Sequence, residues 1–229
     1  MNKDFTKLEE KIQIYFDNKD LLTQAFIHRS YLNENPNIGL QHNERLEFLG
    51  DAVLELSVTE YLYNKYENPE GELTSWRAAL VNSKMLSKVA QELDFNKFIL
   101  LSRGEAKDTG RARQFILANA MEALIGAIYL DKGYKLANQF IVKNIVKELP
   151  KVLEKKLYRD PKSTFQEQSQ DKVGVTPTYD VLEESGPDHD RHFVVGVYLE
   201  EELVAEGGGS SKQEAQEEAA QKALEVKGW

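Results

Sequence analysis

The strongest constraint on the fold is a change of sequence pattern at Asp160-Pro161. Up to about residue 156, apolar residues recur three to four positions apart in segments rich in Leu, Ala, Glu and Lys, which is typical of helices. Beyond it, turn residues such as those of 207–209 surround two alternating β-rich runs, 178–182 and 192–199, and the Ala-rich stretch 212–226 predicts a last helix. We therefore predict an all-α domain over 1–150, a linker over 151–160 and a small α+β domain over 161–229.

The net charge of −9 lies entirely in the predicted C-terminal domain. Residues 161–229 hold 6 Lys and Arg against 15 Asp and Glu, whereas the 23 basic and 23 acidic residues of 1–160 cancel. An acidic chain argues against nucleic-acid binding, which normally uses a basic surface. Because the charge is distributed so unevenly, its position decides more than its total.

Several classes of protein are disfavoured by what the sequence lacks. Without cysteine, the chain has no disulfide, thiolate zinc site or cysteine nucleophile. Its N-terminal sequence lacks the apolar segment of a signal peptide, and no window approaches the ~18 apolar residues of a membrane span. We expect a cytoplasmic protein without a membrane partner.

Three carboxylates share one face of a helix predicted to begin near residue 44. At 100° per residue, Glu44, Glu47 and Asp51 point within about 60° of one another. The apolar residues between them indicate a largely buried helix, where clustered carboxylates repel one another and lose hydration. A divalent cation removes both costs, and oxygen ligands suit Mg²⁺ or Mn²⁺. The alternative is a solvated acidic face, but Gly50 favours close packing of this helix.

A second apolar helix is predicted over 115–130, with Glu122 as the charge in its middle and Asn119 one turn earlier on the same face. A core Glu is rarely tolerated unless it is paired or binds a metal. Its natural partner is the first carboxylate stripe, across a helix–helix contact. A position at the exposed edge of the helix is the alternative.

Segments 21–31, 42–55, 70–82 and 116–131 resemble the ribonuclease III family, and 42–55 matches the family signature nearly letter for letter. Residues 161–229 resemble its appended double-stranded-RNA-binding domain, of α-β-β-β-α order. The resemblance covers essentially the whole chain. It implies a Mg²⁺-dependent endoribonuclease that hydrolyses phosphodiester bonds of duplex RNA, leaves short 3′ overhangs and processes ribosomal-RNA precursors and other RNAs.

The resemblance also assigns roles to individual residues. It places catalytic acids at Glu44, Glu47, Asp51, Glu70 and Glu122, and metal ligands at Glu47, Asp51, Asn119 and Glu122. Two divalent metals ~4 Å apart can activate a water and stabilise the leaving oxygen, so no Ser or His is required. His28 and His42 are therefore better explained as packed or capping residues than as general bases.

Asn119 is the main departure from the family, which usually has an Asp ligand at this position. An Asn carbonyl can ligate Mg²⁺, but it brings no charge and accepts no proton. The runner-up function is therefore a duplex-RNA-binding protein with an impaired nuclease site. A third hypothesis, that the chain is an acidic helical protein adaptor, explains neither the paired acidic helices nor the C-terminal domain.

A homodimer is also implied by the resemblance, with Phe48 inserting into the partner subunit. The alternative for Phe48 is an ordinary core residue of its own chain.

Duplex RNA is recognised by shape, through phosphates and 2′-hydroxyls across two minor grooves. Ser163 can cap the first helix of the C-terminal domain, and 209–212 can offer free N–H groups to phosphates. Basic residues are few, since Gln213 and Gln216 occupy positions where the family often has a basic side chain. We expect an isolated 161–229 fragment to bind weakly, with a small salt dependence. The candidate RNA-binding residues are Gln166, Glu167, His189, Ser211 and Lys212.

Overall fold

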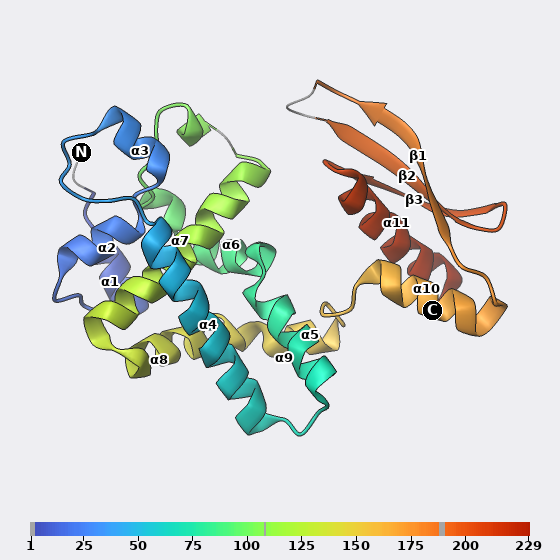
Figure 1. Ribbon diagram of the computed structural model, residues 1–229, viewed down its shortest axis with the longest axis horizontal. Coiled ribbons are helices and arrows are strands. Elements are labelled where there is room, and N and C mark those ends of the chain that lie inside the picture. The colour runs from blue at the N-terminus through green and yellow to red at the C-terminus, as the bar shows by residue number, and fades with distance from the viewer. Residues whose placement is uncertain (1–2, 108, 188–190) are drawn as a thin grey trace. The chain divides into compact units, whose positions relative to one another are not determined.

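The computed structural model describes residues 3–107, 109–187 and 191–229. It divides into two compact units, the first ending at Tyr158 and the second beginning at Arg159 (Figure 1). The first unit is helical and the second has the order α-β-β-β-α, which confirms the predicted fold class. No helix in the described ranges is long and apolar enough to cross a membrane.

Helices make up the first unit, with short 3-10 turns between some of them. The helices are α1 (Thr6–Ile12), α2 (Lys19–Ala25), α3 (Arg29–Glu34), α4 (Glu44–Lys65), α5 (Glu70–Val81), α6 (Ser83–Glu92), α7 (Arg111–Lys132), α8 (Tyr134–Asn144) and α9 (Leu149–Glu154), and the 3-10 turns are η1 (Phe95–Lys97), η2 (Glu105–Lys107) and η3 (Val146–Glu148). Helix α9 occupies the start of the segment expected to be a linker, and Val152 is buried in the core of this unit.

The two long helices α4 and α7 pack against each other at the centre of the first unit (Figure 1). Two glycines permit this contact. A Cβ on Gly50 would lie 1.8 Å from the carbonyl oxygen of Glu122, and one on Gly126 would lie 2.2 Å from that of Leu46. Glycine inside a helix costs ~1 kcal/mol relative to alanine, and here it is required because the two backbones touch.

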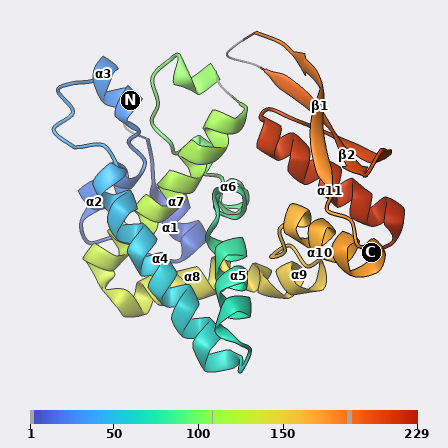
Figure 2. The same cartoon turned by 45° about the vertical axis from the view of Figure 1, so that its right-hand side comes forward.

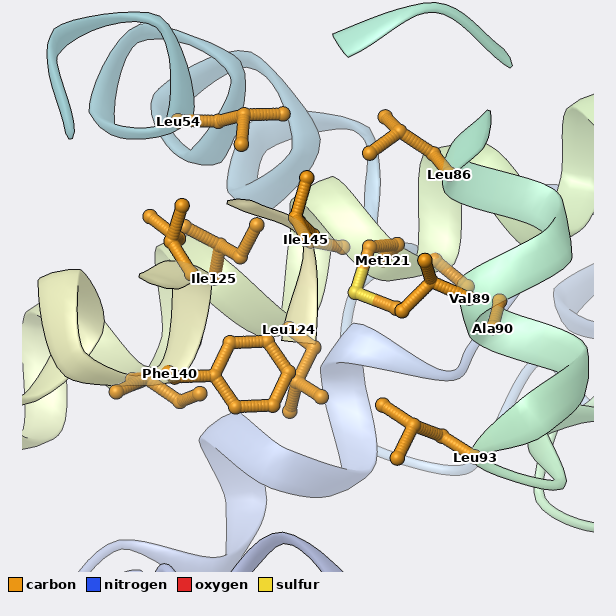
Figure 3. Close-up of a cluster of buried hydrophobic side chains, with 14 of the residues drawn as sticks. Leu54, Leu86, Val89, Ala90, Leu93, Met121, Leu124, Ile125, Phe140 and Ile145 are labelled. Carbon is orange, nitrogen blue, oxygen red and sulfur yellow. The ribbon is translucent and has the colours of Figure 1, made fainter. Parts of the chain in front are cut away.

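The core of the first unit surrounds α7. Met121, Leu124 and Ile125 of this helix point toward side chains of α4, α6 and α8, including Leu54 and Phe140 (Figure 3). Because α7 is buried on most of its circumference, a charged residue in its middle must lie at the edge that meets α4.

The N-terminus of α4 is anchored by Asn43, which is buried. Its backbone N–H donates to Ile27 O, and its side-chain amide donates to Ala25 O at 3.3 Å. Ile27 in turn pairs with Leu100 in an isolated parallel bridge. These contacts fix where the acidic helix begins, and so where its first carboxylates point.

The second unit is a three-stranded antiparallel sheet covered on one face by two helices (Figures 1 and 2). Its elements are α10 (Pro161–Val173), β1 (Thr178–Ser185), β2 (His192–Leu199), β3 (Glu202–Gly209) and α11 (Lys212–Lys227). The N-cap of α10 is Asp160, whose carboxylate accepts from the Ser163 N–H, so the expected cap at Ser163 is wrong. Pro161 occupies the first helical position, where a missing N–H costs nothing.

The glycines at 207–209 form the end of β3 rather than a turn. A Cβ on Gly207 would lie 2.2 Å from the Ala219 nitrogen, and one on Gly209 would lie 2.7 Å from the Ala215 nitrogen. Small residues on both elements therefore let α11 lie directly on the sheet.

Candidate active site

The α4–α7 crossing brings three predicted carboxylates together. Burial, followed by the charges of Asp51 and Glu47, raises the pKa of Glu122 to about 8. Glu122 is half-buried, whereas Asp51 is exposed, so the cluster is open to solvent on the side of Asp51. Glu122 thus lies close enough to two carboxylates of the first stripe for their charges to act on it.

Glu47 and Asn119 complete this group, which we call the acidic cluster: Glu47, Asp51, Asn119 and Glu122. Burial and the charge of Glu44 raise the pKa of Glu47, while a hydrogen bond with the Asn119 side chain lowers it. Asn119 thus stands beside a carboxylate, in the position the sequence predicted for a ligand. Its amide stabilises a charged Glu47 where a fourth carboxylate would repel it.

Glu44 lies at the rim of the acidic cluster. Its carboxylate is 3.6 Å from the Arg29 guanidinium and 3.8 Å from His42 Nδ1. His28 is the N-cap of α3, where its side chain accepts from the Ser30 N–H, and burial lowers the pKa of its imidazole. The capping role predicted for a histidine is confirmed for His28.

Glu70 stands apart from the acidic cluster. It begins α5, accepts a hydrogen bond from the Thr74 hydroxyl at 2.9 Å and lines a cavity of about 750 Å³ between the end of α4 and α5. Tyr63, Leu73 and Arg77 are among the other lining residues. No sequence pattern predicted this cavity, because it depends on how α5 folds back against α4.

Phe48 points away from its own core. Its side chain is 83 % exposed, next in sequence to Glu47, which rules out the alternative of a residue buried in its own chain. Leu56 and Tyr63, 57 % and 78 % exposed, continue an outward-facing apolar row along α4. An exposed row of large apolar residues marks an interaction surface.

The acidic cluster suits a hard divalent cation by its chemistry. Every donor is a carboxylate or amide oxygen, and the pKa values of Glu47 and Glu122 are raised by burial and then by repulsion, both of which a cation would offset. Across the described residues, no three His, Cys, Asp or Glu side chains stand in an arrangement that could hold a metal as they are. The fit therefore rests on the donor set and its electrostatics, with the Asn119 amide as the fourth donor.

The candidate RNA-binding residues occupy two elements of the second unit. Gln166 and Glu167 are exposed on α10, and Lys212 is exposed at the start of α11 with its ammonium 5.7 Å from the centre of the Phe193 ring. Ser211 is the N-cap of α11, and its hydroxyl accepts from the Glu214 N–H. His189 lies outside the described residues.

The N–H groups before α11 are less free than the sequence predicted. The Ser210 N–H donates to the Glu214 carboxylate at 2.9 Å, and the Gly208 N–H donates to the Glu218 carboxylate. Glutamate in the first turn of a helix commonly reaches back in this way. The spacing of Ser211 and Glu214 was the available signal, because it matches a capping box.

Comparison with known proteins gives two family matches that together span most of the chain. The description Ribonuclease-III-like matches residues 18–149, and Double-stranded RNA binding motif matches residues 161–227. Ribonuclease 3 of Natranaerobius thermophilus is 47% identical over 95% of this chain and 94% of its own length. Ribonuclease 3 of Nitratiruptor is 44% identical over 98% and 97%.

A solved structure resembles the first unit. The nuclease domain of ribonuclease III from Campylobacter jejuni is 42% identical with a TM-score of 0.58, covering 64% of this chain and 99% of that domain. It is described as flexible in a region involved in dimer formation.

Proposed function

The chain belongs to the ribonuclease III family of endoribonucleases specific for double-stranded RNA, and we propose that it hydrolyses RNA at the acidic cluster. The observation that carries this proposal is the convergence of Glu47, Asp51 and Glu122 with Asn119 where the backbones of α4 and α7 touch. Carboxylates that repel one another destabilise a fold, so we infer that this cluster binds the cation of a cation-dependent reaction.

Mg²⁺, with Mn²⁺ as a substitute, is the cofactor that the donor set fits, held by Glu47, Asp51, Asn119 and Glu122. When bound, it supplies an activated water and neutralises charge on the phosphate oxygens. Glu122 offers a half-buried carboxylate and Asp51 an exposed one. The Asn119 amide, hydrogen-bonded to Glu47, favours its charged form and orients it for binding.

Phe48 and the cavity beside Glu70 support a two-fold dimer. Phe48 lies near the start of α4 and Tyr63, in the cavity wall, near its end, about 22 Å away along the helix axis. Phe48 therefore cannot enter the cavity of its own chain. In a two-fold pair with α4 antiparallel to its copy, each Phe48 enters the other subunit's cavity, since such an interface is reciprocal.

This pairing explains how Glu70 can belong to a catalytic site although it lies apart from the acidic cluster of its own chain. Because Glu70 lines the cavity that receives Phe48, the dimer sets it beside the acidic cluster of the other subunit, next to Glu47. Two sites, one from each subunit, then cut the two strands of a duplex and leave short 3′ overhangs. Precursors of ribosomal RNA and other structured transcripts in the cytoplasm are the proposed substrates.

Asn119 favours a second candidate, in which the chain binds duplex RNA but cleaves it poorly. The amide brings no negative charge to the acidic cluster, and fewer charges bind a divalent cation less tightly. A helical protein adaptor, in contrast, has no use for the RNA-binding motif at 161–227.

One experiment separates these functions. The natural protein, Asn119→Asp and Glu122→Gln are incubated with a duplex RNA, with Mg²⁺, with Mn²⁺ and with EDTA. Metal-dependent cleavage by the natural protein, lost in Glu122→Gln, supports the proposed reaction. Cleavage by Asn119→Asp alone supports the impaired nuclease. Full activity of Glu122→Gln would remove the acidic cluster from the reaction.

A further inference from the structure

The second unit has few cations, and half of them are held by carboxylates. Residues 161–229 contain six Lys and Arg. Arg191 is paired with Glu184, Lys222 with Glu218, and Lys227 with Glu202. A side-chain cation that is already paired with a carboxylate gains less free energy from binding a phosphate. The cations that matter for RNA must therefore be sought among Lys162, Lys172 and Lys212.

Two of these three lysines meet at α11. Lys162 starts from the first turn of α10, and its ammonium donates to the side-chain oxygen of Gln216 on α11 at 2.6 Å. The same ammonium lies 5.1 Å from the centre of the Tyr179 ring. Lys212 rests on the Phe193 ring. The third lysine, Lys172, lies over Trp229 at the other end of α10.

The two lysines reach successive turns of α11, because Gln216, which accepts from the Lys162 ammonium, lies one helical turn after Lys212. Ala215, between Lys212 and Gln216, is buried in a cluster with Phe193 and Val195, against which Tyr179 packs. Lys162 and Lys212 therefore flank the first turns of α11. We call this pair of ammonium groups the α11 cation pair.

Lys162 is already positioned for a ligand. Its stem is half-buried between α10 and α11, so it loses little conformational freedom when it binds an anion. An ammonium has three donors, and one of them is used by Gln216. The Asp160 carboxylate acts on Lys162 through its charge, but its oxygen accepts from Ser163.

We propose that Lys162 is a phosphate-binding residue for duplex RNA and acts with Lys212 as one cation pair at the start of α11. The inference rests on the proposed binding of duplex RNA by this unit and names a residue for it. It explains how a domain with net charge −9 binds a polyanion: of the three lysines that form no ion pair with a described carboxylate, two lie at the first turns of α11, while acidic residues pair with Arg191, Lys222 and Lys227.

The test measures affinity of the full chain for a duplex RNA against salt concentration, in EDTA so that RNA is not cut. Lys162→Gln should weaken binding several-fold at 0.1 M salt and lower the slope of log K against log salt by about 1, because one phosphate contact is lost. Lys162→Arg should keep the natural slope. Lys172→Gln, the matched control at the far end of α10, should also keep it.

Moving the cation from α10 to α11 distinguishes a phosphate contact from a purely structural bond between the two helices. In the double variant Lys162→Gln, Gln216→Lys, the cation returns to the same place from the other helix, and the natural slope should return with it. Thermal unfolding of each variant shows whether the domain is folded.

Two outcomes would overturn the proposal. One is a natural slope in folded Lys162→Gln; the other is an equal loss of slope in Lys172→Gln, which would mean that only total charge matters. A natural protein that does not bind duplex RNA would instead overturn the proposed function on which this inference rests.

Discussion

A single amide distinguishes the acidic cluster from a site made only of carboxylates. Asn119 lowers the pKa of Glu47 through a hydrogen bond, against the burial and the Glu44 charge that raise it. The natural cluster therefore carries three carboxylates whose repulsion is partly relieved by the protein itself. The amide at position 119 therefore raises the stability of the cluster without metal and lowers its affinity for a metal ion.

Replacing Asn119 with Asp should shift that balance. Without divalent cations, the added charge should lower the free energy of unfolding by about 1 kcal/mol, as like charges do at close range. Added Mg²⁺ should raise the Tm of Asn119→Asp more than that of the natural protein, because ligand binding stabilises the folded state. The control is Asn96→Asp at an exposed position, where Mg²⁺ should have no larger effect than on the natural protein.

The pKa of Glu122 predicts how stability depends on pH in EDTA. Burial raises this pKa from 4.5 to about 8, with Asp51 and Glu47 adding to it, so the folded state keeps a proton that the unfolded chain releases. Stability contributed by the neutral acid is therefore lost as pH rises from about 4.5 to about 8.

Glu122→Gln should abolish this loss. The variant should unfold at nearly the natural Tm at pH 4.5 and be more stable at pH 8.5, by on the order of 2 kcal/mol after allowance for partial exposure. Thermal unfolding across this pH range measures the difference. A variant of the exposed Glu10, Glu10→Gln, should follow the natural curve; a parallel curve for Glu122→Gln would contradict the assigned pKa.

At the scale of elements, the contact of α4 and α7 depends on two glycines that a helix would otherwise avoid. Gly50 lies against the Glu122 carbonyl, one position before Asp51. The same backbone contact therefore holds the core together and sets the distance between the carboxylates of the two helices.

Gly50→Ala should separate the two helices. Its Cβ would lie 1.8 Å from a backbone oxygen that cannot rotate away, so we expect a loss of about 3 kcal/mol or more in the free energy of unfolding. Gly71→Ala is the matched control: no atom lies within 4 Å of its Cβ position in α5, and the substitution should leave stability unchanged or raise it by up to about 1 kcal/mol. Denaturant unfolding of both variants tests this contrast.

Strand β1 shows what element-level patterns miss. The alternation of 178–182 predicted only its first part, yet the strand continues to Ser185 across a bulge between Val181 and Glu183. The exposed glutamates of this extension carry no strand signal of their own. They are in the sheet because β2 supplies hydrogen-bonding partners along its whole length.

At the scale of the whole molecule, Phe48 should control dimerisation. Phe48→Ala should weaken the dimer by about 2 kcal/mol or more, as buried aromatic anchors do at interfaces, and should leave the stability of the single chain nearly unchanged because the side chain is 83 % exposed within it. Sedimentation measures the dimer constant. Tyr15→Ala, at another exposed aromatic residue, should not change it.

The second unit should bind RNA as an isolated fragment, but weakly. It has its own core, in which Phe165 packs with Val197 and Ala219, so residues 159–229 should fold alone. With two cations gathered at α11, the slope of log K against log salt should be near −2. A much steeper slope would mean that further phosphate contacts exist in this unit.

The sequence by itself determined the division near residue 160, the two acidic helices and the α+β character of the second unit. These features depend on the periodicity and composition of neighbouring residues, which act within one helix or strand. Local spacing also indicated that Glu44, Glu47 and Asp51 share one face of α4. It identified Glu122 as a charge in need of a partner.

Only the tertiary structure decided which groups meet. Packing of α4 on α7 joined Glu122 and Asn119 to Glu47, and left Glu70 in a separate cavity. It exposed Phe48 and brought Lys162 of α10 to Gln216 of α11. Charge–charge energies and burial depend on distances between residues far apart in the chain, and those distances exist only once the helices are packed.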